Sequence, residues 1–307
     1  MYIFNHIIGS FLVEESGVIT EEVLITSTQT TTQCAAVMQK KHPKTPAAPA
    51  EIISKILISL KERKYISLYQ VANEQTTTTA IKATVNEDFL IIQAVGLMDE
   101  IDKAVNILAK RLREWHALSY PELEDKTQDH FFYARLIYTK TNQEIEKELN
   151  LPNLLGHELS EVDRAPIRLL SKQVMDLFEL RKETENYIQQ VMVKYAPNFT
   201  ELAGPNIAAK LLMFARSLKH LAMLPASTIQ LFGAEKALFR HIKTGARSPK
   251  YGIIINHPIV ANASKDNKGK AARLLADKLS LCARLDYFKG EFKAVEYRAD
   301  IEKRLAN

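Results

Sequence analysis

Residues 204–288 read GPNIAAKLLMFARSLKHLAMLPASTIQLFGAEKALFRHIKTGARSPKYGIIINHPIVANASKDNKGKAARLLADKLSLCARLDYF. Within this stretch, the segment GAEKALFR at 233–240 predicts the start of a helix, and Gly245 predicts its end. Three apolar residues of this helix fall outside its charged face, and we expect them to anchor it to the rest of the domain: Leu238, Phe239 and Ile242. Residues 253–255 (III) read as a buried strand or helix segment.

The predicted helix carries a row of cations. Lys236, Arg240 and Lys243 are four and three residues apart, so they share one helical face. Arg247 and Lys250 continue the row into the following loop, which Pro249 stiffens. Such a row is typical of a surface that binds phosphates. The alternative is a solvated helix face whose C-terminal charges are favoured by the helix dipole, and the residues by themselves do not separate the two readings.

A second cationic row is predicted on a helix that begins near residue 268. Lys270, Arg273 and Arg284 fall on nearly one side of it, because eleven residues make about three helical turns. Arginine can contact phosphate in a bidentate manner and stack on bases, so Arg273 and Arg284 are the better candidates for specific contacts. Asp277 lies one turn after Arg273, and an ion pair between them is the alternative interpretation.

The charge distribution supports a basic module attached to a mildly acidic body. Residues 204–307 contain 19 Lys and Arg against 8 Asp and Glu, whereas the rest of the chain contains 22 against 28. Such a module indicates a polyanionic partner, most often nucleic acid, although a solvated basic surface has the same composition.

Composition and motifs point away from catalysis. The chain has 307 residues and 46% hydrophobic content, enough for two or three small cores. Its two cysteines, Cys34 and Cys282, are far apart and form no CxxC, so neither a disulfide framework nor a zinc site is indicated. GxGxxG, Walker A and HExxH motifs are missing, so we predict a protein that is not an enzyme and has no cofactor or metal. No apolar run is long enough to span a membrane, and residues 1–13 read as a strand with a hairpin rather than a signal peptide.

The N-terminal region, residues 1–87, is predicted to be a small α+β domain. Short apolar runs at 2–4, 7–8 and 23–25 suit strands, and the Thr-rich stretches near 28–32 and 76–79 favour β structure or a linker. Residues 42–49 (HPKTPAAP) predict a loop, and residues 51–64 an amphipathic helix with Ile52, Ile56 and Leu60 on one side.

A helical connector (88–124) and a long antiparallel helical hairpin (125–196) are expected next. The connector is an apolar-faced helix from 88 to 115, broken by Pro121. The hairpin has arms at about 125–150 and 161–195, with Ser160 as N-cap and residues 151–156 as the tip. Its second arm shows sustained three-four spacing at Ile167, Leu170, Val174, Leu177, Ile188 and Val191. Two such arms cannot bury both faces, so we expect the hairpin to form a coiled coil with a second copy through these residues. An intramolecular bundle with the flanking helices is the alternative.

Residues 204–288 resemble the Nop domain. The resemblance extends to DFLIIQA at 88–94, RLREWH at 111–116 and YPEL at 120–123, which look like the family's segment leading into its coiled coil, so it covers roughly 88–295. It implies a mainly α protein with a small N-terminal α+β domain, a coiled-coil hairpin and an all-helical Nop domain at 197–307. The chain is similar to the scaffold subunit of archaeal box C/D small ribonucleoproteins.

That resemblance also implies a function and partners. Family scaffolds have no catalytic residues; they grip a kink-turn guide RNA already bound by a small ribosomal-protein-like protein, and they dimerise through the coiled coil. Their N-terminal domain, here residues 1–87, holds the methyltransferase fibrillarin, and the complex methylates ribose 2′-hydroxyls at guide-specified positions. The alternative within the family is a splicing-type Nop protein that has no methyltransferase partner.

The resemblance implies RNA contacts for twelve residues: Gly233, Ala234, Glu235, Lys236, Phe239, Arg240, Lys243, Arg247, Lys250, Lys270, Arg273 and Arg284. Lys250 stands where related proteins place a residue on an exposed base, but a lysine cannot stack as an imidazole does. The Thr-rich N-terminal region departs from the family pattern. The chain ends at Asn307 without the Lys/Glu-rich tail of eukaryotic relatives, which favours an archaeal member in the cytoplasm.

Overall fold

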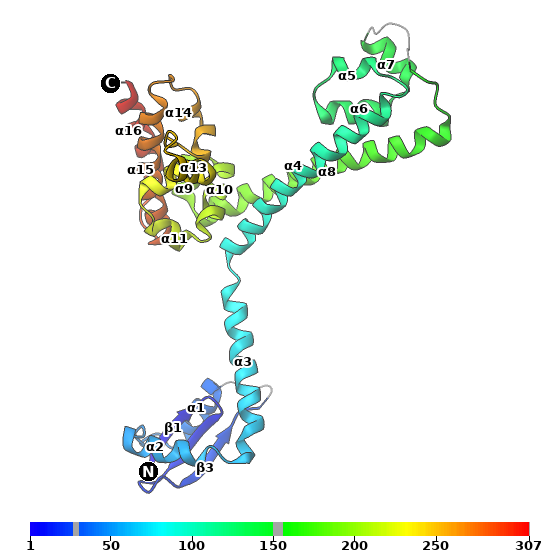
Figure 1. Cartoon of the computed structure of the whole chain (residues 1–307). Coiled ribbons are helices and arrows are strands. Elements are labelled where there is room, and N and C mark those ends of the chain that lie inside the picture. Colours follow the sequence, from blue (N-terminus) through cyan, green and yellow to red (C-terminus); the bar gives the residue numbers. More distant parts are fainter. Residues whose placement is uncertain (27–30, 150–155, 307) are drawn as a thin grey trace. The chain divides into compact units, whose positions relative to one another are not determined.

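The structure, a computed structural model, describes residues 1–26, 31–149 and 156–306. It divides into two units, Met1–Val85 and Asn86–Asn307 (Figure 1). Each unit has apolar cores of its own. The mainly helical class with a small sheet, predicted from the sequence, is confirmed.

The N-terminal unit is built on a three-stranded antiparallel sheet in the order β1-β2-β3. The strands are β1 (Tyr2–His6), β2 (Gly9–Val13) and β3 (Ile19–Leu24), and every residue of the central strand is buried. Helix α1 (Thr31–Lys41) packs Met38 against Ile3 and Leu12, while helix α2 (Ala50–Ser59) belongs to the larger cluster around Phe11. Side chains alternate between the two faces of the sheet along each strand, so the sheet packs against two different helices. The predicted strand at 7–8 is wrong, because these residues form the turn between β1 and β2.

Two further predictions in this unit need correction. The helix expected over 51–64 ends at Ser59, and a 3-10 turn, η1 (Arg63–Tyr65), follows it. The Thr stretch at 76–79, for which β structure or a linker was predicted, lies inside helix α3 (Ile66–Thr84). Threonine costs a helix only about 0.7 kcal/mol relative to alanine, and hydroxyls bond back to the helix, as Thr76 Oγ1 does to the Ala72 carbonyl at 2.7 Å. Of the stretch at 28–32, residues 28–30 lie outside the described residues and Thr31 begins α1.

The second unit contains two long helices that run antiparallel, α4 (Glu87–His116) and α8 (Glu161–Tyr195) (Figure 1). The start of α4 shares a core with the end of α8, where Ile91 and Ile188 are buried together. The end of α4 shares a second core with the start of α8, which holds Leu112 and Val174. An ion pair from Arg181 Nε to Asp102 Oδ1 at 2.6 Å joins the two helices between these cores.

The partner of α8 differs from the prediction. The segment 125–150 is not one arm; it is divided among α5 (Glu122–Lys126), α6 (His130–Thr139) and α7 (Asn142–Leu149). Local caps interrupt it: the Asp129 carboxylate accepts from the Phe132 amide at 3.0 Å, and Thr141 pairs with Glu144 at the start of α7. Helix α8 therefore pairs along its length with α4, and α6 covers its first half. Residues 151–155 of the predicted tip lie outside the described residues.

The remaining helices form a compact body around α15 (Lys268–Tyr287). They are α9 (Pro197–Ala203), α10 (Pro205–Ala215), α11 (Leu218–Met223), α12 (Ala226–Leu231), α13 (Glu235–Thr244), η2 (Ile253–Asn256), α14 (Pro258–Ala261) and α16 (Ala294–Ala306). Alanines and leucines cover the buried side of α15, including Ala272, Leu275 and Leu279. Among the described helices, none has the length and apolar composition that a bilayer-spanning segment needs.

We predict that acid weakens the far end of the α4–α8 pair through His116. This side chain is 4% exposed, its Nδ1 lies 3.2 Å from Tyr133 Oη, and burial lowers the pKa of His116 to about 4. Below pH 6.5 the unfolded chain takes up a proton that the folded chain refuses, so stability falls as the pH drops toward 4. The loss between pH 7.5 and pH 5 is about 2 kcal/mol. Urea unfolding of His116→Gln should lack this component.

The matched control for this experiment is His220→Gln, because His220 is exposed on α11. It should keep the wild-type dependence of stability on pH. An equal pH dependence in His116→Gln and the wild type would contradict the prediction.

Candidate nucleic-acid interface

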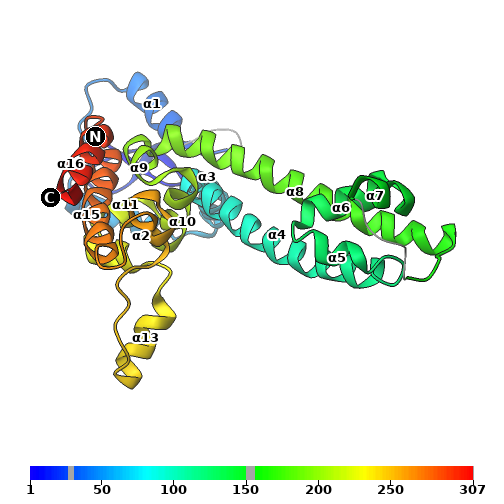
Figure 2. The same ribbon diagram turned by 90° about the horizontal axis from the view of Figure 1, so that it is seen from above.

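Residues 233–252, here named the α13 arm, project from the body of the second unit (Figure 2). The arm consists of α13 and the loop that returns to η2. None of the ten residues of α13 is buried. Gly233 begins the arm with φ +85°, and Gly245 ends the helix in the left-handed region with φ +68°. Both positions need glycine because other residues rarely adopt these angles.

The predicted cations are exposed on this arm. Lys236, Arg240 and Lys243 lie on α13, and Arg247 and Lys250 lie on the loop. Within the described parts of the chain, none of these five makes an ion pair. They are therefore available to neutralise phosphates.

Glu235 has a local structural role at the start of α13. Its Oε1 accepts a hydrogen bond from the Gly233 amide at 2.8 Å. A carboxylate in the first turn also complements the helix dipole. Glu235 thus helps to form the helix that carries the cations. Ala234, the residue before it, is half-buried.

The expectation that apolar residues anchor α13 is wrong for two of the three. Phe239 is 62% exposed and Ile242 is 68% exposed, while Leu238 is half-buried. The sequence pattern indicated an apolar face, but it did not show that this face has no partner inside the chain. Exposed apolar residues on a projecting helix are typical of a surface that another molecule covers.

The second cationic row lies on α15, and the two rows meet at Lys250. A Cβ added to Gly269 would stand 3.6 Å from Lys250 Cδ, so the Lys250 side chain lies against the first turn of α15. Lys270 and Arg273 are exposed next to that turn. Arg273 and Asp277, both described, do not form the ion pair that was the alternative interpretation. Arg284 is eleven residues beyond Arg273, about 16 Å by helical rise. Its Nε donates to the Ala222 carbonyl at 3.2 Å.

Two cations that sequence reasoning missed flank the same turn. Lys265 is exposed just before α15, and the half-buried Lys268 is its first residue. The signal was the run KDNKGK at 265–270, which places three lysines around a helix N-terminus. The positive end of the helix dipole adds to their field. No group of three or more His, Cys, Asp or Glu in the described residues is arranged to hold a metal ion.

The residues predicted for dimerisation are used inside the chain. Ile167, Val174 and Ile188 are at most 2% exposed, and they pack in the two cores of the α4–α8 pair. Leu170, Leu177 and Val191 are half-buried. The structure therefore shows packing within the chain, the alternative to a coiled coil between copies, for Ile167, Val174 and Ile188, and partial packing for Leu170 and Val191.

Comparison with known proteins identifies the family. A family described as "Nop: snoRNA binding domain, fibrillarin" matches residues 97–307. The chain belongs to this Nop family.

Individual relatives agree with this assignment. An "Uncharacterized NOP5 family protein" of Methanocaldococcus jannaschii is 39% identical over 249 residues, which cover 75% of this chain and 60% of that protein. Nucleolar protein 58 of Yarrowia lipolytica is 38% identical over 239 residues, which cover 71% of this chain and 46% of that protein. The chain thus matches about half to three fifths of the length of these relatives. The crystal structure of a fibrillarin/Nop5p complex aligns with 99% of this chain and 98% of its own chain, at 26% identity and a TM-score of 0.48.

We predict that Arg240→Ala, Lys243→Ala and Arg273→Ala each weaken RNA binding without unfolding the protein. These side chains are exposed and make no ion pair with described residues. Each lost phosphate contact should lower the slope of log affinity against log salt by about one unit. Gel shifts over a salt series with kink-turn RNA, alongside thermal melts, provide the measurement.

Lys182→Ala is the matched control, because Lys182 is an exposed lysine on α8, away from the α13 arm. It should change neither the affinity nor the salt slope. If a variant lowers the melting temperature but keeps the wild-type slope, its side chain is structural and does not contact phosphate.

Proposed function

We propose that this chain is the non-catalytic scaffold of a box C/D guide ribonucleoprotein. It binds kink-turn RNA together with the small ribosomal-protein-like protein already bound to that RNA. It recruits fibrillarin for ribose 2′-O-methylation. The observation that carries the proposal is the α13 arm, which exposes a cationic face and an apolar face side by side.

Helical geometry separates the two faces of α13. At 100° per residue, Lys236, Arg240 and Lys243 lie within about 60° of one another. Phe239 and Ile242 lie within about 60° on the adjacent side. Cations alone would fit naked RNA, but the apolar pair fits a protein surface. A helix with both faces exposed fits a partner in which protein and RNA lie next to each other.

The family assignment supports the same proposal. The family description names snoRNA binding and fibrillarin, and the relatives are archaeal NOP5 and eukaryotic nucleolar proteins. A splicing-type Nop protein would share RNA recognition but not the methyltransferase. Binding of fibrillarin is therefore the property that tests this part of the proposal.

Composite recognition predicts a selective effect of the apolar pair. Phe239→Ala and Ile242→Ala should each weaken binding to the complex of kink-turn RNA with its bound protein by about tenfold, as truncation of an interface anchor typically does. Binding to naked kink-turn RNA should stay unchanged, because the cations remain and the proposal assigns Phe239, expected at the RNA from the resemblance, to the protein partner. Gel shifts with both targets at physiological salt measure the difference.

The control for the apolar pair is Val295→Ala, which removes an apolar side chain that is 61% exposed on α16. It should affect neither target. Equal affinity of the wild-type chain for naked RNA and for the RNA–protein complex would refute composite recognition.

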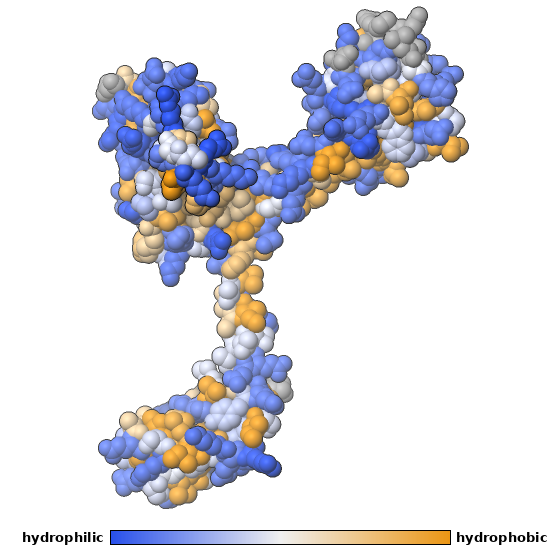
Figure 3. All heavy atoms as spheres, viewed as in Figure 1, coloured by the Kyte–Doolittle hydropathy of each residue, from blue (hydrophilic) through white to orange (hydrophobic). Residues whose placement is uncertain are grey.

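The proposal also includes dimerisation of the chain, through a surface other than the six α8 residues predicted from the sequence. An apolar stripe on the outer side of α8 consists of Val162, Leu169, Leu180 and Tyr187, which are 40–82% exposed. These positions lie within about 20° of one another around the helix. Hydrophobic surface is visible along the α4–α8 pair in Figure 3. A periodic apolar stripe on a long helix fits a second copy of the chain.

The double variant Leu169→Glu, Leu180→Glu should convert dimers into monomers that still bind RNA. Both side chains are exposed, so the change places charge in the interface without disturbing a core. Light scattering at micromolar concentration measures the mass. The control is Val193→Glu, an exposed position about 130° away around the same helix. A monomeric wild type would contradict this part of the proposal.

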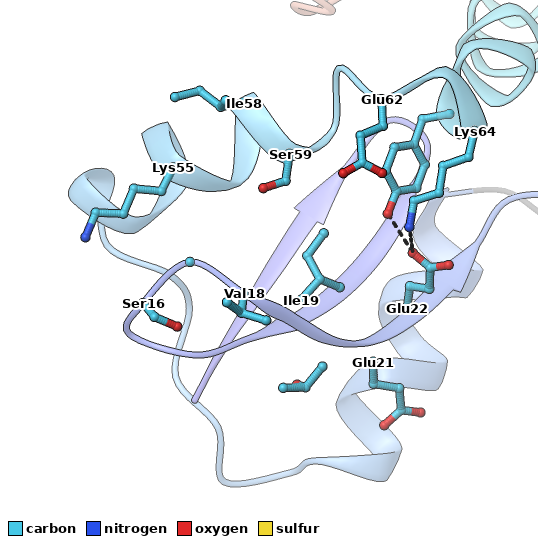
Figure 4. Close-up of a pocket in the computed structure, with 13 residues that line it drawn as sticks. Ser16, Val18, Ile19, Glu21, Glu22, Lys55, Ile58, Ser59, Glu62 and Lys64 are labelled. Carbon is cyan, nitrogen blue, oxygen red and sulfur yellow. Dashed lines mark hydrogen bonds and ion pairs between the residues drawn. The ribbon is translucent and has the colours of Figure 1, made fainter.

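The N-terminal unit is the proposed docking module for fibrillarin, and its open surface lies along β3. On its outer side, β1 is bonded to residues 46–48, where the Ile3 amide donates to the Pro46 carbonyl at 2.9 Å. Strand β2 lies between the other two, so β3 has the open edge. A groove of about 660 Å³ runs between β3 and the end of α2, with Val18 and Ile58 exposed on its rim (Figure 4).

Deleting residues 1–85 should abolish co-purification with fibrillarin and preserve RNA binding and dimerisation. This boundary removes a complete unit, whereas deletion of residues 1–50 would uncover Ile52 and Ile56. Ile58→Glu should weaken the fibrillarin complex in the intact chain. The control is Ile81→Glu on α3, where the isoleucine is 62% exposed against 70% for Ile58. If the intact chain does not bind its cognate fibrillarin, the splicing-type alternative replaces the methylation scaffold.

A further inference from the structure

The α13 arm is joined to the body by a narrow neck. The neck, defined here as residues 230–233 and 250–253, is a pair of chain segments held by three hydrogen bonds. The Gly252 amide donates to the Gln230 carbonyl and the Ile253 amide to the Phe232 carbonyl, both at 2.8 Å. The Gln230 side chain adds a bond from Nε2 to the Lys250 carbonyl at 2.5 Å.

Two glycines allow the segments of the neck to approach this closely. A Cβ added at Gly252 would lie 1.9 Å from the Phe232 carbonyl oxygen, and one at Gly233 would lie 2.3 Å from Ile253 Cγ2. Neither distance is possible for a real side chain. Gly233 also needs its positive φ of 85°. The neck therefore depends on glycine at both ends of the arm.

The neck is anchored firmly on the body side and is the main support of the arm. Phe232 stacks on Phe214 with ring centroids 5.7 Å apart, and Ile254, just beyond the neck, is fully buried. On the arm side, α13 contributes no buried residue to the body. The direction of α13 is consequently set by the neck and not by packing of the helix.

We propose that the neck is a positioning element, which holds α13 in the orientation that lets its cationic and apolar faces meet RNA and protein at the same time. This inference rests on the proposed composite recognition. A rigid two-face helix binds a preassembled surface only in one orientation, so loosening the neck lowers the population of binding-competent molecules. Binding to naked RNA does not require one orientation of α13, because phosphate contacts form in many orientations.

The test uses the full chain with Gly252→Ala and, separately, Gln230→Met. Gly252→Ala forces the segments apart, and Gln230→Met removes the donor to the Lys250 carbonyl without adding a charge beside Lys250. The probes are a kink-turn RNA bound by its ribosomal-protein-like protein, and the same RNA alone. If one molecule in ten keeps the competent orientation, the apparent Kd for the RNA–protein complex rises about tenfold. The affinity and salt slope for naked RNA stay at wild-type values.

Gly96→Ala is the matched control, since it makes the same chemical change on α4 where nothing lies within 4 Å of the added Cβ. It should bind both probes as the wild type does. Thermal unfolding is followed for each variant, because Gly252 is buried and the added Cβ meets the Phe232 backbone. Gln230→Met removes only an exposed hydrogen bond, so it remains informative if Gly252→Ala folds poorly.

A second measurement follows the arm itself and needs no RNA. A spin label at Ser248, which is exposed on the arm loop, should become more mobile in the two neck variants and not in Gly96→Ala. Unchanged label mobility, or a parallel loss of binding to both probes, would overturn the positioning role. If the wild type does not prefer the RNA–protein complex, composite recognition fails instead, and the label still reports whether the neck fixes the arm.

Discussion

Helices α4 and α8 and the C-terminal body share one apolar core, and the arrangement of the second unit depends on it. Ile91 at the start of α4, Ile188 near the end of α8 and Leu275 in α15 are buried in the same cluster. Two buried carboxylates fix the helices around it. Asp88 accepts from the Leu218 amide at 2.9 Å, and Asp286 accepts from the Phe199 amide at 2.8 Å. Burial raises the pKa of both groups, while the backbone donors oppose that rise by stabilising the charged form. Each carboxylate thus ties a helix start to a distant part of the chain.

The sequence predicted those features that repeat along one element. The helix at 88–115 and the cationic row at 236–250 follow from spacing alone, because every third or fourth residue has the same character. Spacing cannot say which element covers an apolar face. Ile167 and Val174 were assigned to a contact between copies, yet α4 and α6 of the same chain cover them. Phe239 and Ile242 were assigned to an anchor, yet nothing in the described chain covers them. In both cases the spacing identified an apolar helix face but not the element that packs against it, because that depends on the tertiary structure.

Charge is also separated along the second unit. Residues 122–163, at the end of the α4–α8 pair farthest from the body, carry ten Asp and Glu against four Lys and Arg. Residues 204–307 carry the excess of Lys and Arg. At physiological ionic strength, fields fall off within about 8 Å, so the acidic end cannot act on the distant body. Its negative charge makes its own surface unfavourable for a polyanion.

Stability and recognition are carried by different parts of the body. Helix α15 contributes a continuous row of buried alanines and leucines to the core, and it exposes Lys270 and Arg273 from a rigid support. Helix α13 contributes no buried residue, so its side chains can be changed without loss of core packing. In the proposed scaffold, the row on α15 holds phosphates on a rigid support, and the arm presents a second surface whose direction the neck sets. Because Lys250 lies against the first turn of α15, the two surfaces form one continuous interface, and an error in the direction of the arm would separate them.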